Sequence, residues 1–344
     1  MTSIAPLRGE DKPTPLRIRD LYVRMLFTRI MDDYIWKLHT QGFIDFVASC
    51  RGHEAAQVGS ALCIEVGKDF TLPYYRDLGV VLTIGMTPHE VFRTYLQDRS
   101  SKNVGLVSTT DRHVDESASF HHWGYHKHNT VTGPAPVATQ LLHAAGIAFA
   151  SKLRKASVVT IAYCGGSATT EPDFLEGLRF AAQHQLPVVF ICEKALAQQP
   201  KGTAMPPSCL NTLPGGLTHQ QVDGTDVVTV YQSMHAALRY AREGHGPILL
   251  EMHVVRALPN IHVPAFQEAT GRRPFVFDGL RIGRENGDLS DPLVSCQHYL
   301  RAHGVWDDDW ANQLCARISN EIECAWHDVL HDILQSSGQS SVYP

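Results

Sequence analysis

The feature that most constrains the fold is an alternation of short apolar runs with helical stretches in the middle of the chain. The apolar runs "SVVTIAY", "PVVFIC" and "GPILLEMHVV" are continuous and rich in β-branched residues. They alternate with "EPDFLEGLRFAAQHQ" and "DVVTVYQSMHAALRYAREG", in which apolar residues recur at helical spacing. Strands that are apolar throughout need cover on both faces. The sequence therefore predicts an α/β fold built on a parallel sheet with helices on both faces.

Further helical segments flank this alternating core. The stretch "IRDLYVRMLFTRIMDDYIWKLHTQG" ends at Gly42, a residue type favoured just beyond a helix. In "TPHEVFRTYLQD", Thr87 is a candidate N-cap. We expect a flexible arm over residues 1–16, one α/β domain over 17–285, and a helical tail over 286–344 that packs on the same domain.

Composition excludes several classes of function. The net charge is −5, from 30 basic and 35 acidic residues, so the chain lacks the basic footprint of a nucleic-acid-binding protein. No apolar run reaches the roughly 18 residues of a membrane span, and the N-terminus lacks a secretory signal. Eight cysteines without a C-x-x-C pair indicate reduced thiols. We expect a cytoplasmic protein with neither a nucleic-acid nor a membrane partner.

Polar loops follow the apolar runs, where open parallel sheets bind their ligands. The turn Gly165-Gly166-Ser167 follows the first run and has two interpretations. It lets a phosphate approach the backbone and the next helix N-terminus. Alternatively it is a plain strand-to-helix turn, with Thr170 and Asp173 forming a capping box.

Other residues are candidates for anion binding or proton transfer. Tyr75 and Arg76 offer a hydroxyl and a guanidinium to a phosphate, and Arg256 after the last run offers another, although such residues are also common surface groups. The cluster "HHWGYHKH" fits no standard zinc spacing. It is either an acid–base loop or a solvated one.

The order of motifs along the chain resembles a known family. These motifs are "FTRIMDDYIWKLHTQGFIDFVASCRGHEAAQVGSA", "YYRDLG", "PVATQ", "ATTEPDFLEGLRFAA", "LPVVFICE", "VDGTDVVTVY", "GPILLEMHVVR" and "DPLVSCQHYLRAHGVW". Together they are similar to the α subunit of the thiamine-diphosphate-dependent decarboxylating component of 2-oxo acid dehydrogenase complexes, of the pyruvate and branched-chain type. The resemblance implies the thiamine-diphosphate-binding fold.

The resemblance also implies partners and site residues. A β subunit would complete an α₂β₂ assembly, and a lipoyl-bearing acyltransferase would take the acyl group. The residues that match the family's cofactor and catalytic positions are Tyr75, Arg76, Val137, Arg256 and His122. Gly165 and Ser167 flank the family's metal-binding position, and His262 lies about two residues out of register with a family histidine. Thiamine diphosphate is the implied cofactor, with His122 and His262 as the implied catalytic histidines.

The magnesium positions depart from the family pattern. Gly166 stands where the family has a metal-binding carboxylate, and Ala195 where it has a metal-binding asparagine. Magnesium demands a nearly octahedral set of oxygen ligands, so these changes argue against a magnesium site. Lys194 suggests a substitute, because an ammonium can neutralise a diphosphate without metal.

Two functions are therefore compatible with the sequence. The first is an α subunit that takes part in oxidative decarboxylation of a 2-oxo acid. The alternative is a pseudoenzyme that keeps the fold and subunit interfaces, has lost magnesium-diphosphate binding, and acts as an assembly or regulatory partner.

Overall fold

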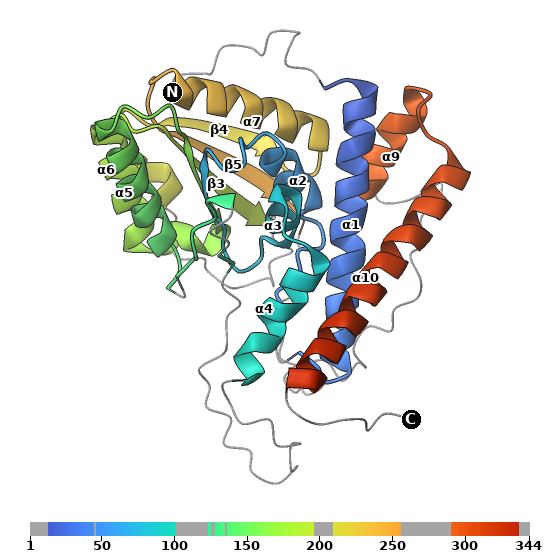
Figure 1. Cartoon of the computed structure of the whole chain (residues 1–344). Helices are drawn as coiled ribbons and strands as arrows, with labels where there is room; N and C mark the ends of the chain where they lie inside the picture. The colour runs from blue at the N-terminus through green and yellow to red at the C-terminus, as the bar shows by residue number, and fades with distance from the viewer. Residues whose placement is uncertain are drawn as a thin grey trace, which may run out of the picture.

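The computed structural model describes residues 13–44, 46–100, 123–124, 128–134, 136–195, 209–255 and 290–336. In these residues a five-stranded parallel sheet lies between two groups of helices (Figure 1). The strands are β1 (Phe70–Leu72), β2 (Thr160–Gly165), β3 (Val188–Ala195), β4 (Thr218–Asp223) and β5 (Ile248–Val254). Their spatial order is β1-β2-β3-β5-β4, and every neighbouring pair is parallel. The predicted α/β fold with a parallel sheet is confirmed.

Two of these strands, β1 and β4, carry no strong strand signal in the sequence. β1 has only three residues. β4 has the sequence "THQQVD" and keeps most of its side chains partly or fully exposed, because it lies at the sheet edge beside β5. A polar edge strand lacks the continuous apolar run that identifies a buried one.

Two helices, α5 (Thr139–Leu153) and α6 (Pro172–Gln183), cover one face of the sheet. Their apolar residues pack with those of β2 and β3 in one buried cluster. The two helices approach closely at Gly177, where an added Cβ would lie 3.0 Å from the backbone carbon of Leu141. This contact explains the small residues in both helices.

The opposite face is covered by α2 (Glu54–Ala61), α3 (Leu78–Ile84) and α7 (Val227–Arg242). Here too a glycine sets the spacing, because a Cβ on Gly59 would lie 2.9 Å from Cγ1 of Val230. The small-residue helix α2 is therefore buried between the sheet layer and the outer helices, as its composition suggests.

An outer layer contains α1 (Pro15–Thr40), α4 (Pro88–Ser100), α9 (Pro292–Ala302) and α10 (Asp308–Ser336). Figure 1 shows α1 between the sheet-covering helices and the pair α9 and α10. Thr14 caps the start of α1, and Gly42 follows its end with a left-handed φ of 81°. Thr87 accepts a hydrogen bond from the Glu90 backbone N–H, so its predicted capping role in α4 is confirmed.

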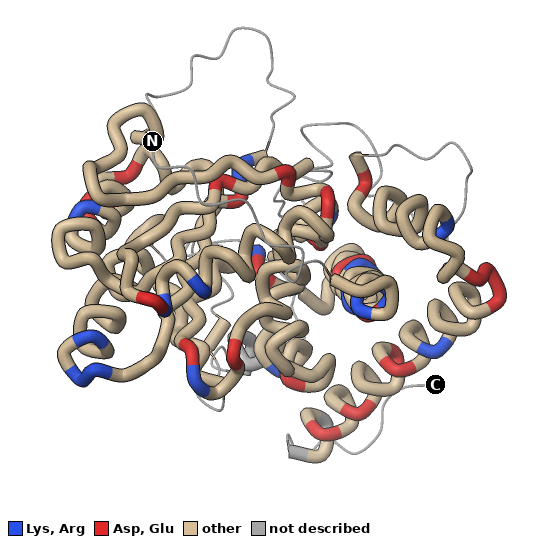
Figure 2. Tube along the Cα trace, turned by 90° about the horizontal axis from the view of Figure 1, so that it is seen from above, with Lys and Arg blue, Asp and Glu red and all other residues tan. Residues whose placement is uncertain are grey.

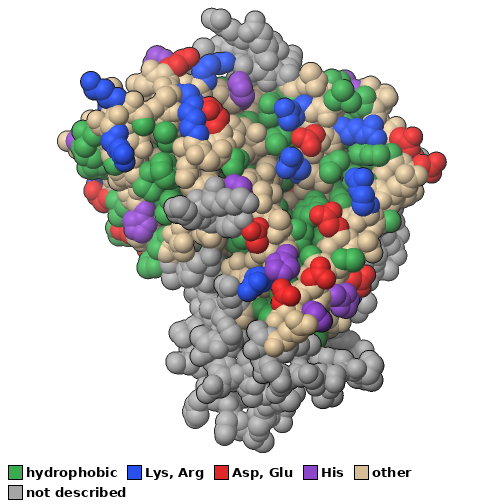
Figure 3. Space-filling model, viewed as in Figure 1, with side chains coloured by type: hydrophobic (Ala, Val, Ile, Leu, Met, Phe, Trp, Pro, Cys, Tyr) green, Lys and Arg blue, Asp and Glu red, His purple; other side chains and the backbone are tan. Residues whose placement is uncertain are grey.

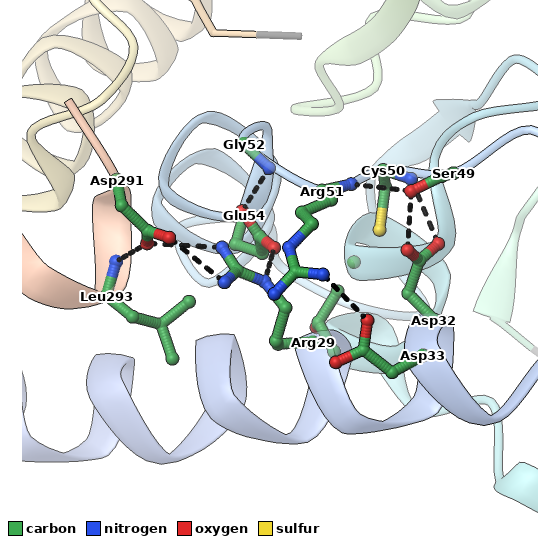
Figure 4. Close-up of polar contacts among 12 residues, drawn as sticks. Arg29, Asp32, Asp33, Ser49, Cys50, Arg51, Gly52, Glu54, Asp291 and Leu293 are labelled. Atoms are coloured by element: carbon green, nitrogen blue, oxygen red, sulfur yellow. Dashed lines mark hydrogen bonds and ion pairs between the residues drawn. The ribbon is translucent and has the colours of Figure 1, made fainter. Parts of the chain in front are cut away.

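A buried ion-pair network joins α1 to α2 and to the start of α9 (Figure 4). The Arg29 guanidinium donates to Glu54, and to both carboxylate oxygens of Asp291 at 3.1 and 3.2 Å. Asp291 also caps α9 by accepting from the Leu293 backbone N–H at 2.9 Å. The network thus connects segments more than 260 residues apart and fixes the tail helices against α1.

Charged residues are spread over all layers of the molecule (Figure 2). On the face shown in Figure 3, basic and acidic side chains are interspersed rather than separated into patches. Among the described residues, no helix has both the length and the apolar character needed to cross a membrane.

Candidate functional site

The carboxyl ends of β2 and β3 lie side by side at one edge of the sheet. Gly165 pairs in register with Glu193, so the turn after β2 lies next to the end of β3. The end of β3 in turn pairs with that of β5 through Lys194 and His253. The strand ends therefore converge as predicted, while the candidate residues His122, Arg256 and His262 lie outside the described residues.

The turn after β2 differs from both sequence interpretations in its details. β2 runs directly into a short 3₁₀-helix, η3 (Gly166–Thr170), before α6 begins at Pro172. Thr170 donates its hydroxyl to the Ser167 carbonyl at 2.9 Å, while Asp173 accepts from the Thr139 hydroxyl at 2.6 Å. The predicted capping box of Thr170 and Asp173 is therefore wrong, because η3 places Thr170 inside a helical turn of its own.

The residues before α3 lie against this turn. A Cβ on Gly165 would lie 3.4 Å from the Tyr74 ring, and the Tyr74 and Tyr75 ring centroids are 5.1 Å apart. The Arg76 side chain is buried, at 4% exposure for the residue, and donates to the Ser49 carbonyl. Tyr74 therefore contacts the glycine turn, and Tyr75 and Arg76 follow it on the segment after β1.

Arg76 keeps its positive charge in this buried setting. Burial lowers the pKa of Arg76, but the neighbouring Tyr74, Tyr75 and Glu193 more than offset that effect and raise it above its usual value. Arg76 is therefore a buried cation on the segment that follows β1.

Glu193 forms a buried network that the sequence reasoning missed. Its Oε2 accepts from the Tyr74 hydroxyl at 2.8 Å, from His53 Nδ1 at 2.6 Å and from Gln57 Nε2 at 3.2 Å. Within the described part of the chain, Glu193 Oε1 and His53 Nε2 are buried without a hydrogen-bond partner. The network fixes Tyr74, and therefore the start of the Tyr75–Arg76 segment, against β3. Its only sequence signal is a carboxylate at the end of an apolar strand.

A second polar group, the Glu251 cluster, consists of Lys194, His219, Gln221, Glu251 and His253. The Glu251 carboxylate accepts from Lys194 Nζ at 2.7 Å, His219 Nε2 at 2.9 Å and His253 Nε2 at 3.1 Å. The hydrogen bond from His219 lowers the pKa of Glu251 most, with burial opposing it and Lys194 and His253 lowering it further. Sequence reasoning found Lys194 but missed its partners, which come from two other strands.

Gly166 lies beside the aliphatic part of the Lys194 side chain. A Cβ at Gly166 would lie 3.4 Å from Lys194 Cα and 3.5 Å from its Cγ, which is ordinary contact. A side chain at 166 would therefore fit, and its absence leaves the Lys194 stem beside the turn. Ala195 packs against the apolar cluster on the other face of the sheet.

The described side chains at this edge form no magnesium ligand set. Among the described residues, no group of three or more His, Cys, Asp or Glu side chains is arranged to hold a metal ion. The carboxylates next to the turn, Glu193 and Glu251, already accept hydrogen bonds from several donors.

Val137 lies at the start of α5, where the backbone is unusual. Val137 is 43% exposed, and the next residue, Ala138, has a left-handed φ of 74°. A non-glycine residue in this region is uncommon and often marks a functional segment. Gln140 holds the segment to β2 by donating to the Tyr163 carbonyl at 2.9 Å.

Comparison with known proteins agrees with this architecture. The family described as "Dehydrogenase E1 component" matches residues 22–333. The chain is 35% identical to the 2-oxoisovalerate dehydrogenase subunit alpha of Bacillus subtilis (strain 168) over 296 residues, 84% of this chain and 83% of that protein.

Other relatives have related names. The chain is 32% identical to the 3-methyl-2-oxobutanoate dehydrogenase subunit alpha of Mycobacterium tuberculosis (strain CDC 1551 / Oshkosh), over 87% of this chain and 75% of that one. It is 29% identical to the pyruvate dehydrogenase E1 component subunit alpha of Staphylococcus epidermidis (strain ATCC 12228 / FDA PCI 1200), over 91% and 78%. From the extent of these matches and the parallel-sheet fold, the chain belongs to the dehydrogenase E1 component family, among its alpha subunits.

Proposed function

We propose that this chain is the α subunit of a thiamine-diphosphate-dependent 2-oxo acid dehydrogenase. Its component would catalyse oxidative decarboxylation of a 2-oxo acid and transfer the acyl group to a lipoyl arm. The observation that carries this proposal is the match of residues 22–333 to the dehydrogenase E1 component family. The resemblance to α subunits over more than 80% of the chain supports it.

The diphosphate end of the cofactor fits this edge. Arg76 is a buried cation, Lys194 a half-exposed one, and Gly165 leaves the backbone accessible beside the Tyr74 ring. Thiamine diphosphate, when bound, supplies the electron sink for loss of carbon dioxide from a 2-oxo acid. The task of this chain is to anchor and orient the diphosphate with Tyr75, Arg76, Gly165, Ser167 and Lys194.

Other residues would act beside this anchor. We assign Arg256 to a further phosphate contact and Val137 to an apolar prop under the cofactor. His122 and His262 would stabilise charge and transfer protons near the substrate, a role for which imidazole is suited. These assignments rest on the positions of the residues in the family motifs.

The partners follow from the same family membership. A β subunit would complete the site in an α₂β₂ assembly, and a lipoyl-bearing acyltransferase would accept the product. All eight cysteines are free thiols, which is typical of a reducing compartment and supports a cytoplasmic location.

The direct test is reconstitution with the β subunit with which the chain assembles. We expect decarboxylation of 3-methyl-2-oxobutanoate or pyruvate, followed with an artificial electron acceptor, only when thiamine diphosphate is added. Arg76→Met should lower kcat/KM by at least about tenfold, because an anion contact of a charged group is worth about 1.5–3 kcal/mol. Arg179→Met, which removes only an exposed pair with Glu176 on α6, is the control.

A second candidate function is favoured by Gly166 and Ala195, which lack the ligand atoms for magnesium. In that case the chain would keep its subunit interfaces and act as an assembly or regulatory partner. Assembly with the β subunit without any binding of thiamine diphosphate would select this second function over the first.

A further inference from the structure

The edge of the sheet beside Gly166 carries one lysine and two histidines around a single carboxylate. Lys194 and His253 pair in register on adjacent parallel strands, and Glu251 precedes His253 by two residues, so all three project to the same face. The His219 side chain reaches Glu251 from β4 at the edge of the sheet. One ammonium and two imidazoles therefore surround a single carboxylate.

The neighbouring strand β4 contributes one acidic side chain to this edge, Asp223. Asp223 of β4 pairs in register with His253, and its Oδ1 accepts from the backbone and hydroxyl of Thr225. The 3₁₀-helices η3 and η4 (Cys209–Thr212) have the sequences "GSATT" and "CLNT", which contain no charged residue. The next acidic residues along the chain after η3, Glu171 and Asp173, lie at the start of α6, where Asp173 accepts from the Thr139 hydroxyl.

The cluster leaves Lys194 able to change its partner. The Glu251 side chain is 1% exposed and that of Lys194 is 37% exposed, so the buried member is the carboxylate and the accessible one is the ammonium. If the ammonium turns towards a ligand, Glu251 keeps its hydrogen bonds from His219 and His253. This matters because a buried carboxylate without partners is strongly destabilising.

We propose that this chain binds the diphosphate of its cofactor without a divalent metal ion, and that Lys194 occupies the place of the metal. The proposal rests on the proposed function, since it concerns the same cofactor. Lys194 provides the charge, the missing side chain at Gly166 provides room beside the lysine stem, and His219 and His253 hold Glu251 when the lysine leaves it. A lysine ammonium is a well-established point-charge ligand of phosphate.

The test measures thiamine diphosphate binding by titration calorimetry to the full chain assembled with its β subunit. Each titration is made with magnesium and again with EDTA after removal of divalent ions. We expect the same dissociation constant, within about twofold, under both conditions. Lys194→Met should weaken binding about ten- to hundredfold, as expected for loss of a charged hydrogen bond, whereas Lys194→Arg should retain most of the affinity.

Two controls separate this effect from damage to the fold. Lys68→Met removes an exposed lysine that forms an ion pair with Glu65. Lys68 lies just before β1, which is separated from β3 by β2, so this variant should leave binding unchanged. Circular dichroism and co-purification with the β subunit check that the Lys194 variants fold and assemble.

The outcomes distinguish this proposal from the proposed function. Binding of thiamine diphosphate that requires magnesium would overturn the metal-free site and leave the α-subunit function intact. Metal-independent binding that is unchanged in folded Lys194→Met would overturn the role of Lys194. Absence of binding under both conditions would overturn this proposal and the cofactor-dependent function together.

Discussion

At the scale of single residues, the site is defined by which charges are buried and which are accessible. Arg76 and Glu193 are buried and held by neighbours, whereas Lys194 is accessible and bound to a carboxylate that has other donors. Gly166 decides the character of the turn, because its missing side chain would lie beside the Lys194 stem. A substitution at Gly166 tests this role of the turn.

Gly166→Asp should weaken metal-free binding of thiamine diphosphate. The new carboxylate fits sterically, would compete with the ligand for Lys194, and would repel the diphosphate, so we expect a loss of about tenfold, or about 1.4 kcal/mol. Magnesium should restore part of the affinity in this variant. Gly146→Asp adds the same charge on α5, where an added Cβ meets nothing within 4 Å, and should change neither quantity.

Asp33 on α1 should make the stability depend on pH. Burial raises the pKa of Asp33 from 3.8 to about 6, although Arg51 at 3.3 Å opposes the shift. The folded protein therefore holds the proton of Asp33 more tightly than the unfolded chain does. This contribution to stability is greatest below pH 3.8 and is lost as the pH rises through about 6.

Asp33→Asn should remove that dependence. Relative to the wild type, the variant should gain on the order of 2 kcal/mol of unfolding free energy between about pH 4 and pH 7, at about 1.4 kcal/mol per pKa unit. Urea unfolding at these two pH values measures it. Asp20→Asn, at an exposed position of the same helix, is the control; an equal pH effect in both variants would contradict this account.

At the scale of elements, the molecule depends on polar connections between segments distant in sequence. Arg29 joins α1 to Glu54 of α2 and to Asp291, which caps α9 (Figure 4). The Glu193 network joins β3 to α2 and to the segment before α3 in the same way.

Arg29→Met should destabilise the protein by about 3–5 kcal/mol, the usual cost of leaving a buried ion partner uncompensated. The burial of Glu54 makes this loss larger than that of a surface pair. Thermal or urea unfolding measures it, with Arg17→Met, at an exposed pair with Asp20, as the matched control. A change below about 1 kcal/mol, the usual limit for exposed pairs, would show that the network does not stabilise the fold.

The elements also show what sequence patterns can predict. The buried strands β2, β3 and β5 and the amphipathic helices were predictable, because burial on both faces or on one stripe leaves a periodic signal. The edge strand β4 was not, since exposed polar residues such as Gln220 and Gln221 carry no such signal. The capping box at Thr170 was wrong because a 3₁₀-turn has no clear local signature.

The candidate site was predictable only in part for a similar reason. Tyr75, Arg76, Gly165 and Lys194 follow from their places at strand ends and in family motifs, and the structure brings them to one edge. Glu251 and His253 share one face of β5, but Lys194 and His219 reach them only through the order of the strands, with β5 between β3 and β4. No local pattern contains that order, so the partners of Lys194 required the structure.

At the scale of the whole molecule, the proposed function makes this chain one side of a site that a β subunit would complete. The anchoring groups lie on the sheet edge and on the segment before α3, so binding of the diphosphate should stabilise several layers at once. Ligands that bind only the folded state raise its stability by about 2.7 kcal/mol at 100 times their dissociation constant.

Thiamine diphosphate at such an excess should therefore raise the melting temperature of the assembled protein by roughly 2–4 °C, a typical response for large domains. Thiamine, which lacks the diphosphate, should give a much smaller change. Differential scanning fluorimetry with EDTA present measures both, and equal shifts for the two compounds would contradict anchoring through the diphosphate.

The most direct test of the central claim is a crystal structure of the assembled protein with thiamine diphosphate, grown with magnesium present. We predict diphosphate oxygens within about 3 Å of Lys194 Nζ, a normal hydrogen-bond distance, with Glu251 retained by His219 and His253. The phosphates should also contact Tyr75 or Arg76. A magnesium ion coordinated octahedrally between the phosphates, with Lys194 still bound to Glu251, would contradict the account.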